Sequence, residues 1–241
     1  MDTLLPAIAH AAFDRLKAVL DNLGAAPPQV LLLEGGSEAQ RMDTARYWAM
    51  RINCPTAGTT GTPCLACPSC QQIAAGEHLD LAAYDGRISN REDEENPGPV
   101  RAFNMERVRE LKVRLRDAPH GQGRRVVLLM GLSLTRDEAS NALLKALEEP
   151  SNTTVFVLLA PQREQLLPTL VSRSFCLTLP WPDCHADDPE MHPWEDALAQ
   201  FLVQGQGFLD KVAGKGAIDA GGATRLLLCC QKAMSRIISG R

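Results

Sequence analysis

This sequence lacks a long apolar run and lacks an excess of positive charge. No stretch of its 241 residues is long and apolar enough to span a membrane, so a membrane protein is not expected. The start of the chain also lacks the charged and then apolar pattern of a secretory signal, which predicts a cytoplasmic protein with reduced thiols. A formal net charge of −4 and a pI near 5.8 argue against binding nucleic acid through bulk electrostatic attraction.

What the sequence does contain is a closely spaced group of cysteines. Four of the eight cysteines form a C-x9-C-x2-C-x2-C array, namely Cys54, Cys64, Cys67 and Cys70. Thiolates spaced in this way can bind one ion across tight turns, so the array predicts a tetrahedral zinc ion held by four sulfurs. Disulfide pairing is the alternative, which a reducing compartment disfavours. A closed site leaves no open coordination position, so we expect a structural zinc worth on the order of 10 kcal/mol to folding.

The remaining cysteines have no such spacing. Cys176 lies in an apolar run, Cys184 lies in a stretch rich in proline and aspartate, and Cys229 and Cys230 lie in a predicted helix. We expect small buried or half-buried side chains at these positions.

Strand and helix patterns alternate over about residues 28–180. Short apolar runs predict strands at 30–33, 80–84, 126–130, 155–159 and 177–179. Apolar residues at helical spacing predict helices at 43–51, 70–75, 105–115, 135–149 and 166–171. This alternation is typical of an α/β fold with a mostly parallel sheet covered on both faces. The cysteine array, over about residues 53–76, is then a zinc module inserted after the first helix.

A chain of 241 residues with 45% hydrophobic content can form one large domain and a small one. We expect the large domain over residues 1–179. Proline and aspartate mark a linker at 180–193, and a helical region follows at 194–241. Its helices are predicted at 194–203, 208–212 and 223–238. The last helix has few partners for its apolar side, so we expect this region to be incomplete, or to be completed by another subunit.

The glycine turn after the first strand lies where nucleotide-binding proteins carry a phosphate-binding loop of the pattern G-x-x-x-x-G-K-[ST]. Gly35 and Gly36 are present here. Gln40, however, stands at the last glycine, Arg41 at the lysine and Met42 at the hydroxyl residue. The strand that should supply acidic residues for magnesium and water activation lacks them. The sequence therefore predicts a degenerate P-loop that holds no ATP. An unrelated fold with an ordinary Gly-Gly turn is the alternative.

Several motifs occur in the order found in one protein family. After the degenerate loop and the cysteine insertion come Gly76-Glu77-His78-Leu79-Asp80, Arg107-Val108-Arg109-Glu110-Leu111, the decapeptide from Asn141 to Pro150, and Ser172-Arg173-Ser174. From about Ala7 to Leu179 the chain resembles the delta-prime subunits of bacterial DNA polymerase III clamp loaders, within the AAA+ superfamily of P-loop NTPases. The resemblance implies an AAA+-like fold followed by a helical lid and a helical collar. Residues 194–241 are fewer than these two regions usually contain in the family.

The same resemblance implies a subunit that does not hydrolyse ATP itself. Such a subunit supports the loading of a sliding clamp onto primed DNA, as part of a DNA polymerase holoenzyme with gamma/tau-like ATPase subunits and a delta-like subunit. Arg173 is then the expected arginine finger, which reaches into the ATP site of a neighbouring subunit. Without the resemblance, an arginine paired with a carboxylate at a helix end would be the simpler interpretation.

Three departures from the family pattern bear on these expectations. Leu79 stands where the family has proline, and Ser174 stands where it has cysteine. Ala160-Pro161 replaces a polar sensor residue of ATP-binding relatives, in agreement with a site that binds no nucleotide. In the decapeptide, Lys145 and two later glutamates lie away from the alanine and leucine stripe, so we expect them at an interface or in solvent.

Two other functions are compatible with parts of the sequence. One is an ATP-binding motor subunit of the gamma/tau type, in which Arg41 replaces the P-loop lysine. The other is a zinc-ribbon nucleic-acid binder. Residues 54–70 contain no lysine, arginine or aromatic residue, which argues against phosphate pairing or base stacking by that module.

Overall fold

The computed structural model describes residues 4–85, 105–132, 137–148, 153–180 and 192–206, together with residues 208, 226–227 and 230–231. The chain divides into two compact units, Met1–Pro180 and Trp181–Arg241. The first unit contains the sheet, the cysteine array, the glycine turn and Arg173.

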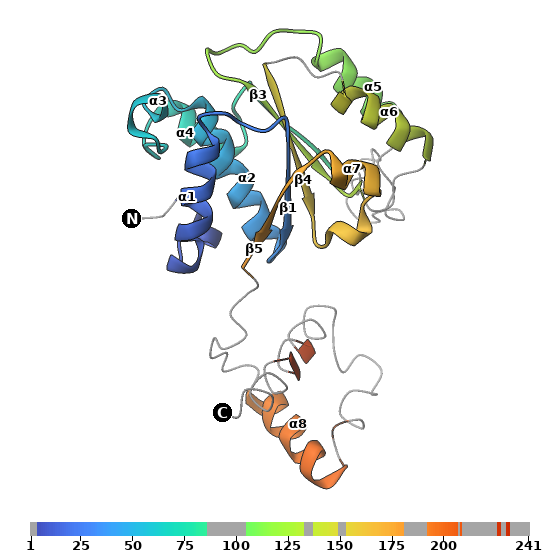
Figure 1. Ribbon diagram of the computed structural model, residues 1–241. Helices are drawn as coiled ribbons and strands as arrows, with labels where there is room; N and C mark the ends of the chain where they lie inside the picture. The colour runs from blue at the N-terminus through green and yellow to red at the C-terminus, as the bar shows by residue number, and fades with distance from the viewer. Residues whose placement is uncertain are drawn as a thin grey trace, which may run out of the picture. The chain divides into compact units, whose positions relative to one another are not determined.

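The first unit is built on a five-stranded parallel sheet (Figure 1). Its strands are β1 (Val30–Gly35), β2 (Leu81–Asp85), β3 (Arg125–Met130), β4 (Thr154–Ala160) and β5 (Phe175–Leu179). They lie in the order β2-β3-β4-β1-β5, and every neighbouring pair is parallel. The predicted α/β fold class with a parallel sheet is therefore confirmed.

The central strands are apolar along almost their whole length because both faces of the sheet are covered. All residues of β1 and β4 are buried. Neighbouring residues face opposite cores, so Leu31 and Leu33 belong to the first core while Val30 and Leu32 belong to the second. The edge strand β5 is mostly exposed or half-buried and becomes buried only at Leu179.

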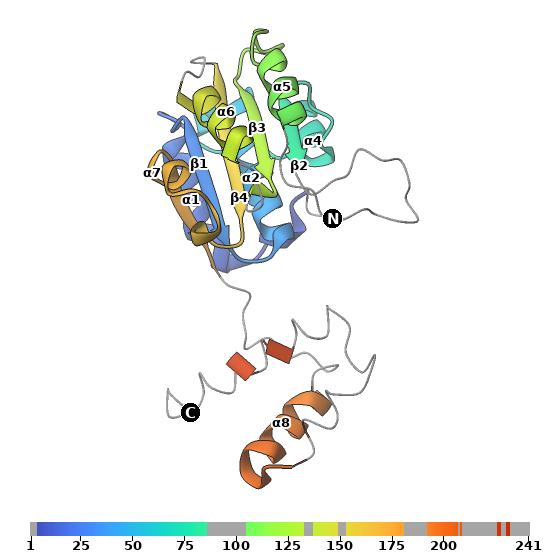
Figure 2. The same ribbon diagram turned by 90° about the vertical axis from the view of Figure 1, so that its right-hand side faces the viewer.

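Helices cover both faces of the sheet, and Figure 2 shows α5 and α6 in front of it. The first side carries α1 (Asp14–Leu23), α2 (Glu38–Asn53), α3 (Ala57–Thr60) and α4 (Pro68–Ala75). The second side carries α5 (Met105–Arg114), α6 (Asp137–Glu148) and α7 (Pro168–Ser172). Short 3-10 turns form at Pro6–Ile8 (η1), Ala11–Phe13 (η2) and Arg163–Gln165 (η4).

The helix α1 was not expected from the sequence, which predicts no element before residue 28. Its residues Leu16 and Leu20 are buried in the first core, together with Phe13 just before the helix. Their spacing of three and four residues is the helical signal that could have identified it.

The helix predicted at 43–51 begins five residues earlier, at Glu38. Ser37 caps it, because the Ser37 hydroxyl accepts from the Gln40 amide at 3.2 Å and the Gln40 side chain accepts from the Ser37 amide at 2.8 Å. This capping box satisfies amides that a helix start otherwise leaves without partners. The segment aligned with the end of a P-loop is therefore helical.

The second unit contains α8 (His192–Gln204), which includes the helix predicted at 194–203. Leu198, Phe208 and Leu226 form a small buried cluster, and the rings of Phe201 and Phe208 lie 5.8 Å apart. Residues 181–191 of the predicted linker, and most of the helices predicted at 208–212 and 223–238, lie outside the described residues, and the last two linker positions, 192 and 193, already belong to α8. In the part of the chain that the structure describes, no helix has the length and apolar character needed to cross a membrane.

Candidate functional sites: the cysteine cluster, the glycine turn and Arg173

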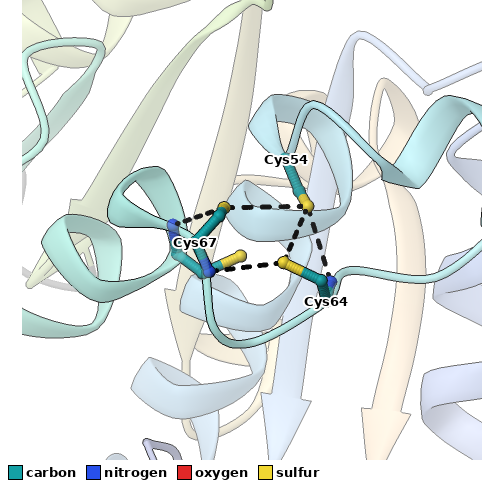
Figure 3. A group of neighbouring side chains, drawn as sticks. Cys54, Cys64 and Cys67 are labelled. Atoms are coloured by element: carbon teal, nitrogen blue, oxygen red, sulfur yellow. Dashed lines mark hydrogen bonds between the residues drawn. The ribbon is translucent and has the colours of Figure 1, made fainter.

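The four cysteines of the array come together beside the carboxyl end of α2. Cys54 caps the end of that helix, and Cys64 follows α3 in the next loop. Cys67 caps the start of α4, and Cys70 lies in its first turn. Figure 3 shows the sulfur atoms of Cys54, Cys64 and Cys67 pointing toward one another.

The spacing of the sulfur atoms fits a tetrahedral metal site. The Cys54 Sγ lies 3.6 Å from the Cys64 Sγ and 3.9 Å from the Cys67 Sγ, and all four sulfurs lie within 4.8 Å of one another. Zinc–sulfur bonds of about 2.3 Å in a tetrahedron place the sulfurs roughly 3.8 Å apart. A disulfide would need a sulfur–sulfur distance of about 2.05 Å. This group can therefore hold a metal ion, and its donor set and spacing suit zinc.

Backbone amides already favour negative charge on part of this cluster. Burial raises the pKa of Cys54, but the Cys64 amide and the Thr56 hydroxyl and amide outweigh it and lower that pKa to about 6. The amides of Ala66 and Cys67 likewise lower the pKa of Cys64. Burial and the neighbouring Cys67 raise the pKa of Cys70. A bound cation would supply the charge that lets all the thiols ionise together.

The cysteine module is part of the first core rather than an appendage. Cys54, Ala57, Cys70 and Ile73 are buried in the same cluster as Trp48 of α2. A metal bound here would therefore stabilise the packing of α3 and α4 on α2, which agrees with a structural role.

The segment from Gly76 to Asp80 connects this module to the loop before β3. The His78 Nε2 lies 3.1 Å from the Ser69 hydroxyl of α4. The Asp80 carboxylate, 1% exposed, accepts from the amides of His120 and Gly121 at 2.8 Å each. The motif therefore acts here as a structural brace.

We expect Asp80→Asn to lower the free energy of unfolding at pH 7 by about 1 to 3 kcal/mol, because the two amides donate to different oxygens of Asp80 and asparagine offers only one acceptor oxygen, which leaves one amide without its partner. Burial raises the pKa of Asp80, but the amides of His120 and Gly121, together with the His120 side chain, outweigh it and hold that pKa below its usual value. The contribution is thus present above about pH 4 and is lost as the pH falls through the folded-state pKa. Urea unfolding at several pH values measures both effects.

Asp14→Asn is the matched control for this prediction, because Asp14 is exposed and pairs with Lys17 only on the surface. It should change the unfolding free energy by less than about 0.5 kcal/mol. Equal losses in the two variants, or a pH dependence that Asp80→Asn leaves intact, would contradict the role assigned to Asp80.

The glycine turn between β1 and α2 is short. Only Gly36 and Ser37 lie between the end of the strand and the start of the helix. Gly35 and Gly36 have φ angles of 75° and 56°, which glycine adopts without strain. The Arg41 guanidinium donates to the carbonyl oxygens of Gly35 and Gly36 at 2.7 and 2.8 Å. Arg41 therefore closes the turn on itself through these two hydrogen bonds.

A pocket of about 120 Å³ lies next to this turn. The start of α2, the ends of β3 and β4, and Leu166 line it, mostly with apolar side chains. The oppositely charged Glu38 and Arg41 are also part of the lining. Pockets for drug-sized ligands usually measure roughly 300 to 1,000 Å³, so this one is small for a nucleotide.

Arg173 lies at the carboxyl end of α7, just before β5, and its side chain is exposed. Its Nη1 donates to the Thr169 carbonyl at 3.2 Å. Parallel pairing sets Phe175 beside Leu31 and Leu179 beside Gly35, so Arg173 lies at the opposite end of the strands from the glycine turn. Four strand residues separate the two ends by about 13 Å. Arg173 therefore lies far from the glycine turn of its own chain.

The structure does not bring the predicted site residues into one site. The cysteines lie on the first side of the sheet, the glycine turn lies at the carboxyl end of β1, and Arg173 lies near the amino end of β5. Lys145 of α6 is exposed, whereas Leu143 and Leu147 are buried, as expected for the decapeptide. The side chain of Glu148 and all of Glu149 lie outside the described part.

Sequence reasoning missed one polar cluster. Glu34, in the otherwise apolar strand β1, is 5% exposed and is bonded to Arg163 and Thr178. An acidic residue within a fully buried strand is the signal that could have drawn attention to it, because a buried charge needs a partner.

Comparisons with known proteins give one consistent result. The family model described as DNA polymerase III, delta subunit, matches residues 11–183. A DNA polymerase III subunit delta' from Pseudomonas aeruginosa is 36% identical over 155 residues, which cover 64% of this chain and 44% of that protein. A DNA polymerase III subunit tau from Escherichia coli strain K12 is 30% identical over 142 residues, which cover 59% of this chain and 20% of that protein.

Among solved structures, a DNA polymerase III gamma subunit-related protein from Thermotoga maritima is similar, with a TM-score of 0.44 and 19% identity. That likeness covers 98% of this chain and 72% of that one. The matches to the delta' and tau relatives span less than half the length of those proteins.

Proposed function

Because this chain belongs to the family of DNA polymerase III delta subunits, we propose that it is a delta-prime-like subunit of a clamp-loader complex. The resemblance to delta-prime proteins that the motifs predicted is confirmed by relatives of that name. In this role the chain is a non-hydrolysing AAA+ scaffold that supports the loading of a sliding clamp onto primed DNA.

The observation that carries the non-hydrolysing role is the closed glycine turn. A P-loop cradles phosphates with backbone amides and a lysine, and it needs several residues between its strand and its helix. Here α2 starts at Glu38, and Arg41 is bonded to the carbonyls of the turn itself. We therefore infer a subunit that holds no ATP.

The position of Arg173 supports a part in a larger assembly. Arg173 is exposed at the end of the sheet away from the glycine turn, a position suited to a neighbour's ATP site. Its partner would be a gamma/tau-like ATPase subunit, whose γ-phosphate a planar guanidinium can contact with two donors. A delta-like subunit, the clamp and primed DNA are the other proposed partners, reached through the complex. The cysteine cluster would hold one structural zinc.

The alternative function is an ATP-binding motor subunit of the gamma/tau type, since a tau protein is also among the relatives. Isothermal titration of the purified chain with magnesium ATP separates the two. We expect no measurable binding at nucleotide concentrations up to about 1 mM. A Kd above about 1 mM corresponds to a binding free energy weaker than about 4 kcal/mol. Micromolar binding together with turnover would establish the motor function instead.

Arg41→Lys is the informative variant for the same titration. It restores the lysine of the P-loop pattern but leaves the two-residue connection and the helix start unchanged. We expect it to bind no more nucleotide than the parent chain, because loop length and not the lysine alone excludes phosphate. Recovery of ATP binding in this variant would show that the loop geometry is not the cause.

A further inference from the structure

At the carboxyl end of the sheet, a buried carboxylate links strand β1 to strand β5 and to the segment that follows β4. Glu34 of β1 pairs with Ala160 of β4 on one side and with Thr178 of β5 on the other. Its Oε2 accepts from the Arg163 amide and from Arg163 Nε at 3.0 Å each, and its Oε1 accepts from Arg163 Nη2 and, at 2.7 Å, from the Thr178 hydroxyl. The carboxylate is thus fully occupied by donors.

Burying the Glu34 carboxylate costs desolvation free energy. A buried ion pair is often no better for stability than apolar residues of the same volume. Its partner Arg163 remains 44% exposed, so the pair is placed where the chain meets solvent. The charges do, however, fix geometry, because a bidentate pair with a guanidinium fork holds one orientation.

What the pair fixes is the segment between β4 and β5. Residues 161–174 contain η4, α7 and Arg173. Arg163, near the start of this segment, is bound to Glu34, while Leu166 and Leu170 in the middle are buried in the second core. Near the far end, the Ser174 hydroxyl donates to the Leu170 carbonyl at 2.7 Å. The Glu34 contact is therefore a side-chain anchor at the start of the segment that carries Arg173, next to the backbone bond from the Gly35 amide to the Pro161 carbonyl.

We propose that the Glu34–Arg163 pair, together with Thr178, is a positioning device that holds Arg173 in a fixed orientation for the neighbouring ATP site. This inference rests on the proposed function of Arg173. In nucleotide switches, a γ-phosphate orders the loops at the ends of the strands and its loss releases them. Here the Glu34–Arg163 pair of the same chain orders the segment after β4. The position of Arg173 therefore does not depend on nucleotide bound to this chain.

The test uses the assembled complex containing the full chain, with steady-state ATP hydrolysis as the readout. We expect Arg163→Ala to lower kcat about 10- to 100-fold at the site that Arg173 faces, with little change in KM, because a small misplacement of a catalytic group has that effect. Glu34→Gln should act in the same direction. In an Arg173→Ala background, Arg163→Ala should have no further effect, because it acts through Arg173.

A second measurement follows the segment directly. Hydrogen exchange of the full chain should show faster exchange of amides in residues 166–174 in Arg163→Ala, while the amides of β1 and β4 stay protected. Asp21→Asn is the matched control, because Asp21 and Arg51 form a partly buried ion pair on the other side of the sheet. It should leave both exchange in 166–174 and kcat unchanged.

The outcomes separate this inference from the function on which it rests. If Arg173→Ala leaves hydrolysis unchanged, the proposed finger itself is wrong. If Arg173→Ala lowers hydrolysis but Arg163→Ala changes neither kcat nor exchange, only the positioning role is overturned. A further loss from Arg163→Ala in the Arg173→Ala background would likewise overturn it, since the residue would then act by another route.

Discussion

Cys64→Ser is expected to abolish stoichiometric zinc binding and to lower the thermal stability of the chain sharply. Cys64 is exposed, so exchanging its thiol for a hydroxyl costs no core packing, and the whole effect comes from the lost ligand. Because metal-binding energy is folding energy in such sites, a loss of about 3 kcal/mol or more is expected. In a chain of this size that loss lowers the Tm by roughly 6 to 12 °C.

Zinc content by atomic absorption and unfolding followed by circular dichroism test this prediction on the same samples. Cys176→Ser is the matched control, because Cys176 is half-buried on β5, outside the cluster. It should keep one zinc per chain and nearly the parent Tm. One equivalent of zinc in purified Cys64→Ser would contradict the four-ligand site. A parent chain without zinc whose cysteines resist thiol reagents after unfolding would instead support disulfides.

Arg173→Ala is expected to leave the isolated chain folded and to slow ATP hydrolysis by the assembled complex. Arginine fingers contribute about 10³- to 10⁵-fold to the turnover of phosphoryl-transfer sites, so hydrolysis at the one site that Arg173 faces should almost stop. Arg173→Lys should recover little of it, because a single ammonium cannot replace the two parallel donors of a guanidinium. Single-turnover hydrolysis by the complex measures the effect.

Arg116→Ala serves as the control for this experiment. Arg116 is also an exposed arginine near the end of a helix, but it follows α5 on another part of the first unit. It should leave hydrolysis and assembly unchanged. Equal rates for the parent and Arg173→Ala complexes, with assembly verified by gel filtration, would rule out the finger.

The strands were predictable because their burial leaves a direct trace in the sequence. Residues 126–130 and 155–159 are unbroken apolar runs, and both lie in strands covered on two faces. The cysteine cluster was predictable for a similar reason, since close spacing along the chain limits how far apart the sulfurs can lie. In both cases local sequence determines the outcome.

The features that were not predicted depend on contacts distant in sequence or on competition between local signals. The contact between Glu34 and Arg163 joins residues 129 positions apart, and no pattern in either neighbourhood specifies the other. The residues after Ser37 align with the end of a P-loop, but they also form a capping box. The structure shows a helix there, because the capping box satisfies the first amides of α2. The start of α2 is thus also the clearest departure of this chain from a nucleotide-binding loop.

The strand order has a consequence for synthesis of the chain. β1 is made first but pairs only with β4 and β5, which begin at residues 154 and 175. At about 5 to 20 residues per second, the ribosome needs roughly 6 to 30 s to supply those partners. During that interval Val30–Leu33 lacks both strands with which it pairs, so the backbone N–H and C=O groups of β1 are without their sheet partners. Folding of the sheet must therefore follow, and cannot accompany, translation of its first strand.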